Sequence, residues 1–155
     1  MSTEFRRAIS TPLGDVLLCA DADGLTALCF DAQEAAADEH PLLLLAEAQL
    51  QEYFAGRRRR FSVPLSIHGS EFQRQVWRAL MQIPYGTTVS YRAIAAAIGN
   101  PKACRAVGMA NHANSLPIFI PCHRVVGANG RLTGYAGGLE IKRFLLELEQ
   151  SNAEV

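Results

Sequence analysis

The sequence lacks any long apolar run. Its apolar stretches, such as residues 42–46 and 116–121, are far shorter than the roughly 20 residues that a membrane-spanning helix needs. The first seven residues are polar and charged, and no apolar signal-peptide segment follows them. We therefore expect a cytoplasmic protein with no membrane partner.

Cysteine is scarce and never occurs in C-x-x-C spacing. The four cysteines are Cys19, Cys29, Cys104 and Cys122. Their spacing does not indicate a zinc knuckle or a thioredoxin-like redox site. In a reducing compartment they stay free thiols, and each could simply fill the core as a small apolar side chain.

A net charge of one sign is also missing, because 15 basic and 15 acidic residues cancel. Of the 155 residues, 49% are hydrophobic and 19% are charged, which excludes a disordered chain. The length allows one domain or two small ones.

The charge balance hides an asymmetry. Residues 1–56 contain ten acidic and two basic residues, whereas residues 69–139 contain one acidic and seven basic residues. A basic second half suits contact with a polyanion, although ordinary solvated charges would give the same composition. The run Arg57–Arg60 is expected to be linker surface, with non-specific attraction to phosphate as the alternative.

The first half of the chain predicts a β-meander and a helix. Apolar stretches around residues 8–9, 16–18 and 25–30 are separated by sequences with turn chemistry. A helix is expected over 41–55, with Pro41 in its first turn and Gly56 after its end. The following stretch, 57–69, has the composition of a linker.

The second half predicts helices. Ser70 and Gln73 form a capping-box pattern at the start of a helix that should stop before Pro84. Ser90 can cap a helix over 91–98, and Asn100 can cap the next, with Pro101 in its first turn and its end near residue 112. These two helices fit a helix-turn-helix, and a last helix is expected over 139–149.

The second helix of a helix-turn-helix is the one that meets nucleic acid. Here it carries Lys102 and Arg105. Between and after them stand small residues that allow a close approach to a surface: Ala103, Cys104, Ala106, Gly108 and Ala110. The same small residues would also suit packing inside the domain, so this pattern alone is a weak signal.

Cys122 stands where an apolar segment ends. Residues 118–120 are a candidate buried strand, and the chain then reads Pro121-Cys122-His123-Arg124. A nearby imidazole and positive charge favour the thiolate, the reactive form of cysteine. Adjacent side chains usually point apart, so a bridging water is an alternative to direct Cys–His contact. In the structural alternative Cys122 fills the core, His123 is a hydrogen-bonded, half-buried residue and Arg124 is solvated.

The run from Pro121 to Val125 resembles the active-site signature of the O6-alkylguanine-DNA alkyltransferases (methylated-DNA–protein-cysteine methyltransferases). The resemblance covers most of residues 70–149. It includes the stretches 72–77, 83–86, 89–91, 99–103, 105–108 and 134–138, together with Lys142. Residues 1–66 are less diagnostic, although the turn sequence 11–14 also fits.

The resemblance implies an α+β fold. A small ribonuclease-H-like domain of β-meander and helix would occupy residues 1–66. A mainly helical DNA-binding and alkyl-acceptor domain with a helix-turn-helix would occupy residues 67–155. The implied activity is direct-reversal DNA repair, the irreversible, single-use transfer of an alkyl group from guanine O6 to Cys122, with thymine O4 as an alternative target.

The resemblance also implies roles for site residues. Cys122 would be the nucleophile, His123 would deprotonate it through a water, and Glu149 would orient His123. Asn114 would tie the recognition helix to the cysteine segment. Tyr91 would donate a hydrogen bond or proton to guanine N3.

Further residues would contact DNA or the base. Arg105 would enter the duplex in place of the flipped nucleotide, on a DNA-binding surface with Lys102, Ala103, Ala106 and Gly108. The base pocket would be walled by Tyr135, Ala136, Gly137 and Gly138.

Two departures from the family pattern stand out. Some family members hold zinc in the N-terminal domain, but the corresponding stretch 20–26 has no Cys–His set, so we expect no metal and no cofactor. Ala136 replaces a hydroxyl residue found in some members, which could change the tolerance for bulky O6 groups. The expected partner is alkylated double-stranded DNA, bound by a monomer.

Two other functions are consistent with the residues. A helix-turn-helix module could flag alkylated DNA without repairing it, although Cys122 argues against that class. A Cys–His hydrolase would turn over many times and would have no use for DNA.

Overall fold

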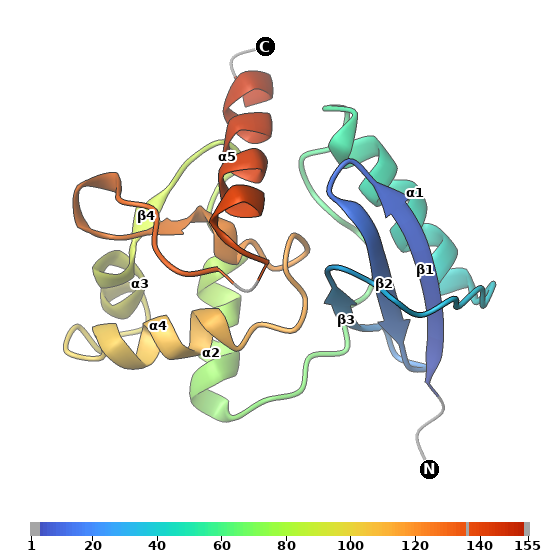
Figure 1. Ribbon diagram of the computed structural model, residues 1–155. Coiled ribbons are helices and arrows are strands. Elements are labelled where there is room, and N and C mark those ends of the chain that lie inside the picture. The colour runs from blue at the N-terminus through green and yellow to red at the C-terminus, as the bar shows by residue number, and fades with distance from the viewer. Residues whose placement is uncertain (1–3, 136, 154–155) are drawn as a thin grey trace. The chain divides into compact units, whose positions relative to one another are not determined.

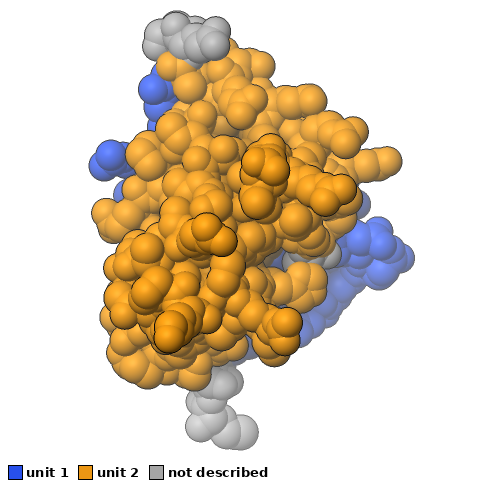
Figure 2. Space-filling model, turned by 90° about the vertical axis from the view of Figure 1, so that its left-hand side faces the viewer, with its two compact units in different colours: residues 1–68 blue, residues 69–155 orange. Residues whose placement is uncertain are grey.

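The computed structural model describes residues 4–135 and 137–153 (Figure 1). The chain divides into two compact units, residues 1–68 and 69–155, which are coloured separately in Figure 2. Within the described ranges, no helix combines the length and apolar character needed to cross a membrane.

Unit 1 is built on an antiparallel sheet of three strands in the order β1-β2-β3. The strands are β1 (Phe5–Thr11), β2 (Gly14–Ala20) and β3 (Leu25–Cys29). At the start of β2, directly after the turn, Gly14 has a φ of 96°, a value that favours glycine. In the next turn the Asp21 carboxylate accepts hydrogen bonds from the amides of Asp23 and Gly24. The predicted meander is confirmed.

One helix, α1 (Pro41–Phe54), packs against the sheet through β1 and β2. The His40 side chain accepts a hydrogen bond from the Leu42 amide at 3.2 Å and caps the helix start. Gly56, with a φ of 76°, follows its end. The helix buries an apolar face that includes Leu43, Leu50 and Tyr53, as its sequence pattern indicated.

The stretch after α1 packs back onto unit 1. Leu25 donates its amide to the Pro64 carbonyl at 2.9 Å, and Ser66 donates to the Leu25 carbonyl at 2.7 Å. A Cβ on Gly24 would lie 2.7 Å from the Pro64 oxygen, so this close approach requires glycine. The Ser66 hydroxyl also donates to the Asp21 carboxylate at 2.7 Å.

Unit 2 is mainly helical. Helix α2 (Glu71–Leu80) starts with the predicted capping box, in which Ser70 and Gln73 each bond the other's backbone amide. Helices α3 (Tyr91–Ala97) and α4 (Cys104–His112) pack against each other and against α2. The Trp77 indole donates to the Ala110 carbonyl at 2.8 Å, which joins α2 to α4.

The predicted start of the second helix of this pair is wrong. Asn100 does not cap α4, because its amide bonds the Ala95 carbonyl at 3.0 Å and closes the end of α3. Its carbonyl then accepts from the Ala103 amide, which makes a turn over residues 100–103. Lys102 and Ala103 therefore precede α4, which begins without a side-chain cap.

The strand expected over 118–120 is also absent from the described backbone. Ile118 has a φ of 76°, which no strand allows, and residues 117 and 120 close a tight turn through an isolated bridge. The segment is nevertheless buried, as its apolar sequence indicated.

The remaining elements hold the nucleophile segment. A 3₁₀ turn, η1 (Cys122–Arg124), leads into β5 (Val125–Val126), which pairs in parallel with β4 (Val89–Ser90). Since β4 runs directly into α3, this pairing brings Tyr91 near the segment after Cys122. A second 3₁₀ turn, η2 (Ala128–Gly130), precedes the last helix, α5 (Leu139–Ala153).

Candidate active site

The thiol of Cys122 is held at the start of η1, where only 3% of the residue is exposed. Its amide donates to the Ile120 carbonyl at 2.7 Å. Burial raises the pKa of the Cys122 thiol to about 11, although the Asn114 amide, the charge of Lys142 and the Tyr135 hydroxyl each lower it in part. Fewer than about one thiol in a thousand is therefore ionised at pH 7, so reaction requires a base.

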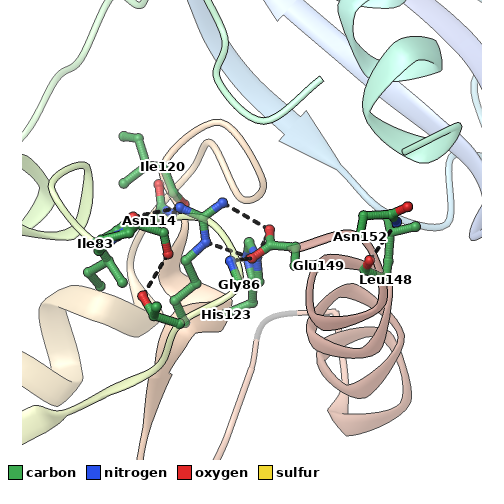
Figure 3. Close-up of polar contacts among 11 residues, drawn as sticks. Ile83, Gly86, Asn114, Ile120, His123, Leu148, Glu149 and Asn152 are labelled. Atoms are coloured by element: carbon green, nitrogen blue, oxygen red, sulfur yellow. Dashed lines mark hydrogen bonds and ion pairs between the residues drawn. The ribbon is translucent and has the colours of Figure 1, made fainter. Parts of the chain in front are cut away.

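The next residue supplies an imidazole inside a buried polar cluster. His123 Nε2 lies 2.7 Å from Glu149 Oε2, and Arg124 binds the same carboxylate through Nε at 2.8 Å and Nη2 at 2.9 Å. His123 and Glu149 are fully buried. Figure 3 shows Glu149 projecting from α5 toward His123.

Three further contacts surround this cluster. Arg124 Nη1 donates to the Ile83 carbonyl at 2.7 Å, and the Gly86 amide donates to Glu149 Oε1 at 3.4 Å (Figure 3). The Arg124 guanidinium also lies over the Tyr85 ring, 5.7 Å from its centroid. The alternative of a solvated Arg124 is wrong, because this arginine neutralises a buried carboxylate.

The environment keeps His123 neutral and Glu149 ionised. Burial lowers the pKa of His123, and the charges of Arg124 and Lys142 lower it further, against the opposing effect of Glu149. Burial alone would raise the pKa of Glu149, but its bonds to His123 and Arg124 outweigh this, and the pKa lies below its ordinary value. His123 Nδ1 has no hydrogen-bond partner among the described residues, and can accept a proton.

These pKa shifts predict loss of stability in acid. His123 and Glu149 each have a lower pKa in the folded state than in the unfolded chain. When the pH falls below the unfolded-state pKa of either group, the unfolded chain therefore binds more protons than the folded protein. The contribution of His123 is present above about pH 6.5 and lost below it, and that of Glu149 is lost below about pH 4.3. We expect the urea concentration at the unfolding midpoint to decrease when the pH is lowered from 7.5 to 5.

The variant His123→Gln should show a smaller fall over this interval. His112→Gln is the matched control, because His112 is exposed on α4. An urea midpoint of the wild type that stays constant from pH 7.5 to pH 5 would contradict a neutral, buried His123.

Asn114 holds the backbone just before the nucleophile. Its Nδ2 donates to the Ile120 carbonyl at 2.9 Å, and its Oδ1 accepts from the Leu116 amide at 2.9 Å (Figure 3 shows the first contact). It lies two residues after the end of α4, and so links that helix to the Cys122 segment. The Asn111 amide reaches the Cys122 carbonyl more weakly, at 3.5 Å.

The residues expected around the base lie in the segment before α5. Tyr135 is buried. This burial raises the pKa of its hydroxyl, and the nearby Cys122 thiol raises it further. The Gly138 amide donates to the Tyr135 carbonyl at 3.0 Å, and Gly138 has a φ of 97°. Gly137 is half-buried, whereas Ala136 lies outside the described residues. The Tyr91 hydroxyl lies 2.6 Å from Thr133 Oγ1.

The candidate DNA-facing surface lies at the start of α4. Arg105 and Ala106 are exposed on the helix, and Lys102 is exposed in the turn before it. Ala103 is half-buried there, and Gly108 is half-buried against α3, where an added Cβ would lie 3.9 Å from the Tyr91 ring. Sequence reasoning missed Met109, which is 70% exposed on the same helix.

Sequence reasoning also missed the parts played by Arg124, Lys142 and Thr133. Lys142 is fully buried, and its ammonium donates to the carbonyls of Val125 and Thr133. Two signals pointed to Lys142: it belongs to the family resemblance, and it lies on the buried face of a helix. In the described part of the chain, no group of three or more His, Cys, Asp or Glu residues could hold a metal ion.

Comparison with known proteins identifies the two units. Residues 71–151 match the 6-O-methylguanine DNA methyltransferase, DNA binding domain, and residues 5–67 match the ribonuclease-like domain of the same enzymes. The chain belongs to the O6-methylguanine-DNA methyltransferase family. Its function is DNA repair by transfer of a methyl group to a cysteine.

Three relatives of this methyltransferase match over more than nine tenths of their length. The constitutive methylated-DNA–protein-cysteine methyltransferase of Bacillus subtilis is 53% identical over 152 residues, covering 90% of this chain and 92% of that protein. A methylated-DNA–protein-cysteine methyltransferase of Methanosarcina acetivorans is 49% identical, covering 91% and 95%. The crystal structure of Mycobacterium tuberculosis OGT in complex with DNA superposes with a TM-score of 0.88 at 45% identity, covering 96% and 94%.

Proposed function

We propose that Cys122 is the methyl acceptor and that the substrate is O6-alkylguanine in double-stranded DNA. The observation that carries the proposal is the position of Cys122, which directly precedes a neutral, buried His123 held by Glu149 at 2.7 Å. A nucleophile, a base and a group that orients the base are the parts that such a transfer needs.

The reaction balances without a cofactor. His123 accepts the thiol proton through a water, and the sulfur attacks the methyl carbon. The bond between that carbon and O6 breaks, and its electron pair stays with guanine, which takes up one proton. The products are guanine and S-methylcysteine. Because a thioether has no easy hydrolysis route, each molecule acts once.

Tyr91 and Asn114 assist this transfer, the first at the base and the second at the nucleophile. Tyr91 donates a hydrogen bond or a proton to guanine N3 as the base becomes negative. Asn114 keeps the backbone before Cys122 in place through its bonds to Ile120 and Leu116. Among the described residues, Tyr135, Gly137 and Gly138 form the base pocket. Thymine O4 presents the same chemistry in a smaller ring.

The target carbon lies within the duplex, so the nucleotide must leave the base stack, at a cost of a few kcal/mol. Arg105, exposed on α4, fills the space that the flipped nucleotide leaves in the duplex. The surface that approaches DNA is lined by Lys102, Ala103, Ala106 and Gly108. The relative from Mycobacterium tuberculosis was crystallised with DNA, which supports DNA as the partner. We expect one molecule to act as a monomer.

The direct test is to incubate the protein with duplex DNA containing O6-methylguanine and to weigh its tryptic peptides. We expect a gain of one methyl group on the peptide that contains Cys122, saturating at one per molecule. Tight binding to the lesion without methyl uptake would instead support a module that flags damage. Repeated turnover of a small ester without DNA would support a hydrolase.

The variant Arg105→Ala should slow transfer from duplex DNA by about 10- to 100-fold, because nothing then offsets the loss of stacking. Transfer from the free base O6-benzylguanine should not change, since no nucleotide has to be flipped. Single-turnover rates on the two substrates measure the difference.

Arg78→Ala is the matched control for this prediction, because Arg78 is an exposed arginine on α2 of the same unit. It removes the same charge and should leave the ratio of the two rates unchanged. A slower reaction of Arg105→Ala with the free base would show that Arg105 affects the pocket rather than flipping.

A further inference from the structure

Thr133 is held at three points in the segment that precedes the base pocket. Its hydroxyl oxygen lies 2.6 Å from the Tyr91 hydroxyl. Its carbonyl accepts a hydrogen bond from Lys142 Nζ at 3.1 Å. Its methyl group packs beside Gly127, where an added Cβ would lie 3.0 Å from it. These contacts fix both the backbone and the side chain of Thr133.

The contact with Lys142 joins Thr133 to the nucleophile segment. The same ammonium donates to the Val125 carbonyl at 2.7 Å, in the strand that begins directly after η1. Lys142 is fully buried, so its two carbonyl partners stabilise a charge that is otherwise removed from water. The segment just before the base pocket and the segment after Cys122 are therefore held by one cation.

The contact between Thr133 and Tyr91 determines the direction of the phenolic hydrogen of Tyr91. Either hydroxyl can donate in this pair, but a phenol whose hydrogen is used by Thr133 cannot donate it to a base. When Thr133 donates instead, the phenol oxygen accepts and the phenolic hydrogen stays free. Thr133 Oγ1 has Tyr91 as its one hydrogen-bond partner among the described residues, so nothing competes for the threonine hydrogen.

We propose that Thr133 is a positioning residue for methyl transfer. Its hydroxyl donates to the Tyr91 oxygen and directs the phenolic hydrogen toward the bound guanine, while Lys142 holds its backbone at the start of the pocket. This inference rests on the proposed role of Tyr91. The Thr133 hydroxyl orients the Tyr91 hydroxyl, so the two residues act together on the base.

The test compares Thr133→Ser with Thr133→Ala, each alone and combined with Tyr91→Phe. Serine keeps the hydroxyl and loses the methyl group, whereas alanine loses both and introduces no clash. We expect Thr133→Ala to slow single-turnover transfer at saturating duplex DNA by about 10-fold, the value of one hydrogen bond, with the Kd for DNA unchanged. Thr133→Ser should stay within about twofold of the wild type.

The Tyr91→Phe background distinguishes positioning from a merely structural role. In that background the serine and alanine variants should react at equal rates, because no phenol remains to be oriented. Equal slowing by Thr133→Ala in both backgrounds would overturn the proposal, and so would a serine variant as slow as the alanine variant.

Thr11→Ala is the matched control, because Thr11 also makes a 2.7 Å hydroxyl hydrogen bond, to the Gly14 carbonyl in unit 1. It should leave the transfer rate unchanged, and thermal unfolding of every variant shows that each is folded. A wild-type protein that takes up no methyl group on Cys122 would overturn the proposed function, and the inference with it. Methyl uptake by the wild type with no effect of Thr133→Ala would overturn the inference alone.

Discussion

Replacing Cys122 with alanine is expected to abolish methyl uptake from O6-methylguanine DNA, while the Kd for duplex DNA stays within about threefold of the wild type. The reacting sulfur is lost, so the proposed transfer has no nucleophile. DNA affinity is retained because phosphate contacts dominate it, and Cys122 is buried. Mass spectrometry of the intact protein and a DNA-binding titration measure the two quantities.

Cys19 provides a close control for this variant. It is a buried cysteine of unit 1 with the same 3% exposure as Cys122, and burial also raises the pKa of its thiol, to about 12. The two thiols have different neighbours. The Glu4 side chain hydrogen-bonds Cys19 and raises the pKa of its thiol further. Cys19→Ala should therefore keep full methyl uptake. Uptake by Cys122→Ala would show that the acceptor is another cysteine.

The variant Glu149→Gln should both destabilise the protein and slow transfer. It keeps the shape of the side chain but removes the charge that Arg124 and His123 share. Arg124 would stay buried without its counter-ion, a change that typically costs about 3–5 kcal/mol. The total free energy of unfolding of such a protein is about 5–15 kcal/mol, so the loss is a large fraction of it. Urea denaturation at pH 7.5 measures the change.

Transfer by the folded fraction of Glu149→Gln should slow by at least about 100-fold. A positioned general base contributes about 10²–10⁴ to a rate, and without the carboxylate His123 loses the group that orients it. Rates measured at 10 °C, normalised to the folded fraction, separate this effect from stability.

Glu147→Gln, an exposed position on the same helix, is the control for both measurements. Its stability should stay within about 0.5 kcal/mol of the wild type. An equally stable and equally fast Glu149→Gln would contradict both the buried ion pair and the orienting role.

Local sequence signals predicted most of the secondary structure because their physics is local. The capping box at Ser70, the turn chemistry at 11–14 and 21–24, and the apolar face of α1 each act within a few residues. The two errors have different causes: a neighbouring helix in the first case, and a positive φ at Ile118 in the second. The amide of Asn100 closes α3 instead of starting α4, and the apolar segment 118–120 is buried as a turn.

The nucleophile was predictable for a similar reason. Pro121-Cys122-His123-Arg124 is a contiguous motif, so its identity needs no long-range contact. The sequence could not indicate which way each side chain of the motif points. Because η1 is a 3₁₀ turn, the side chains of His123 and Arg124 both reach Glu149, 26 and 25 residues away along the chain.

The local sequence therefore indicates the chemistry, through one cysteine in a diagnostic motif, a basic second half and helices suited to DNA. The ionisation states of the site residues, in contrast, depend on the folded structure. Removal of water keeps His123 neutral and raises the pKa of Cys122, and pairing with Arg124 keeps Glu149 charged. The folded structure also joins Thr133 to Tyr91 across 42 residues. Burial and pairing depend on which distant segments meet, and no local pattern encodes that.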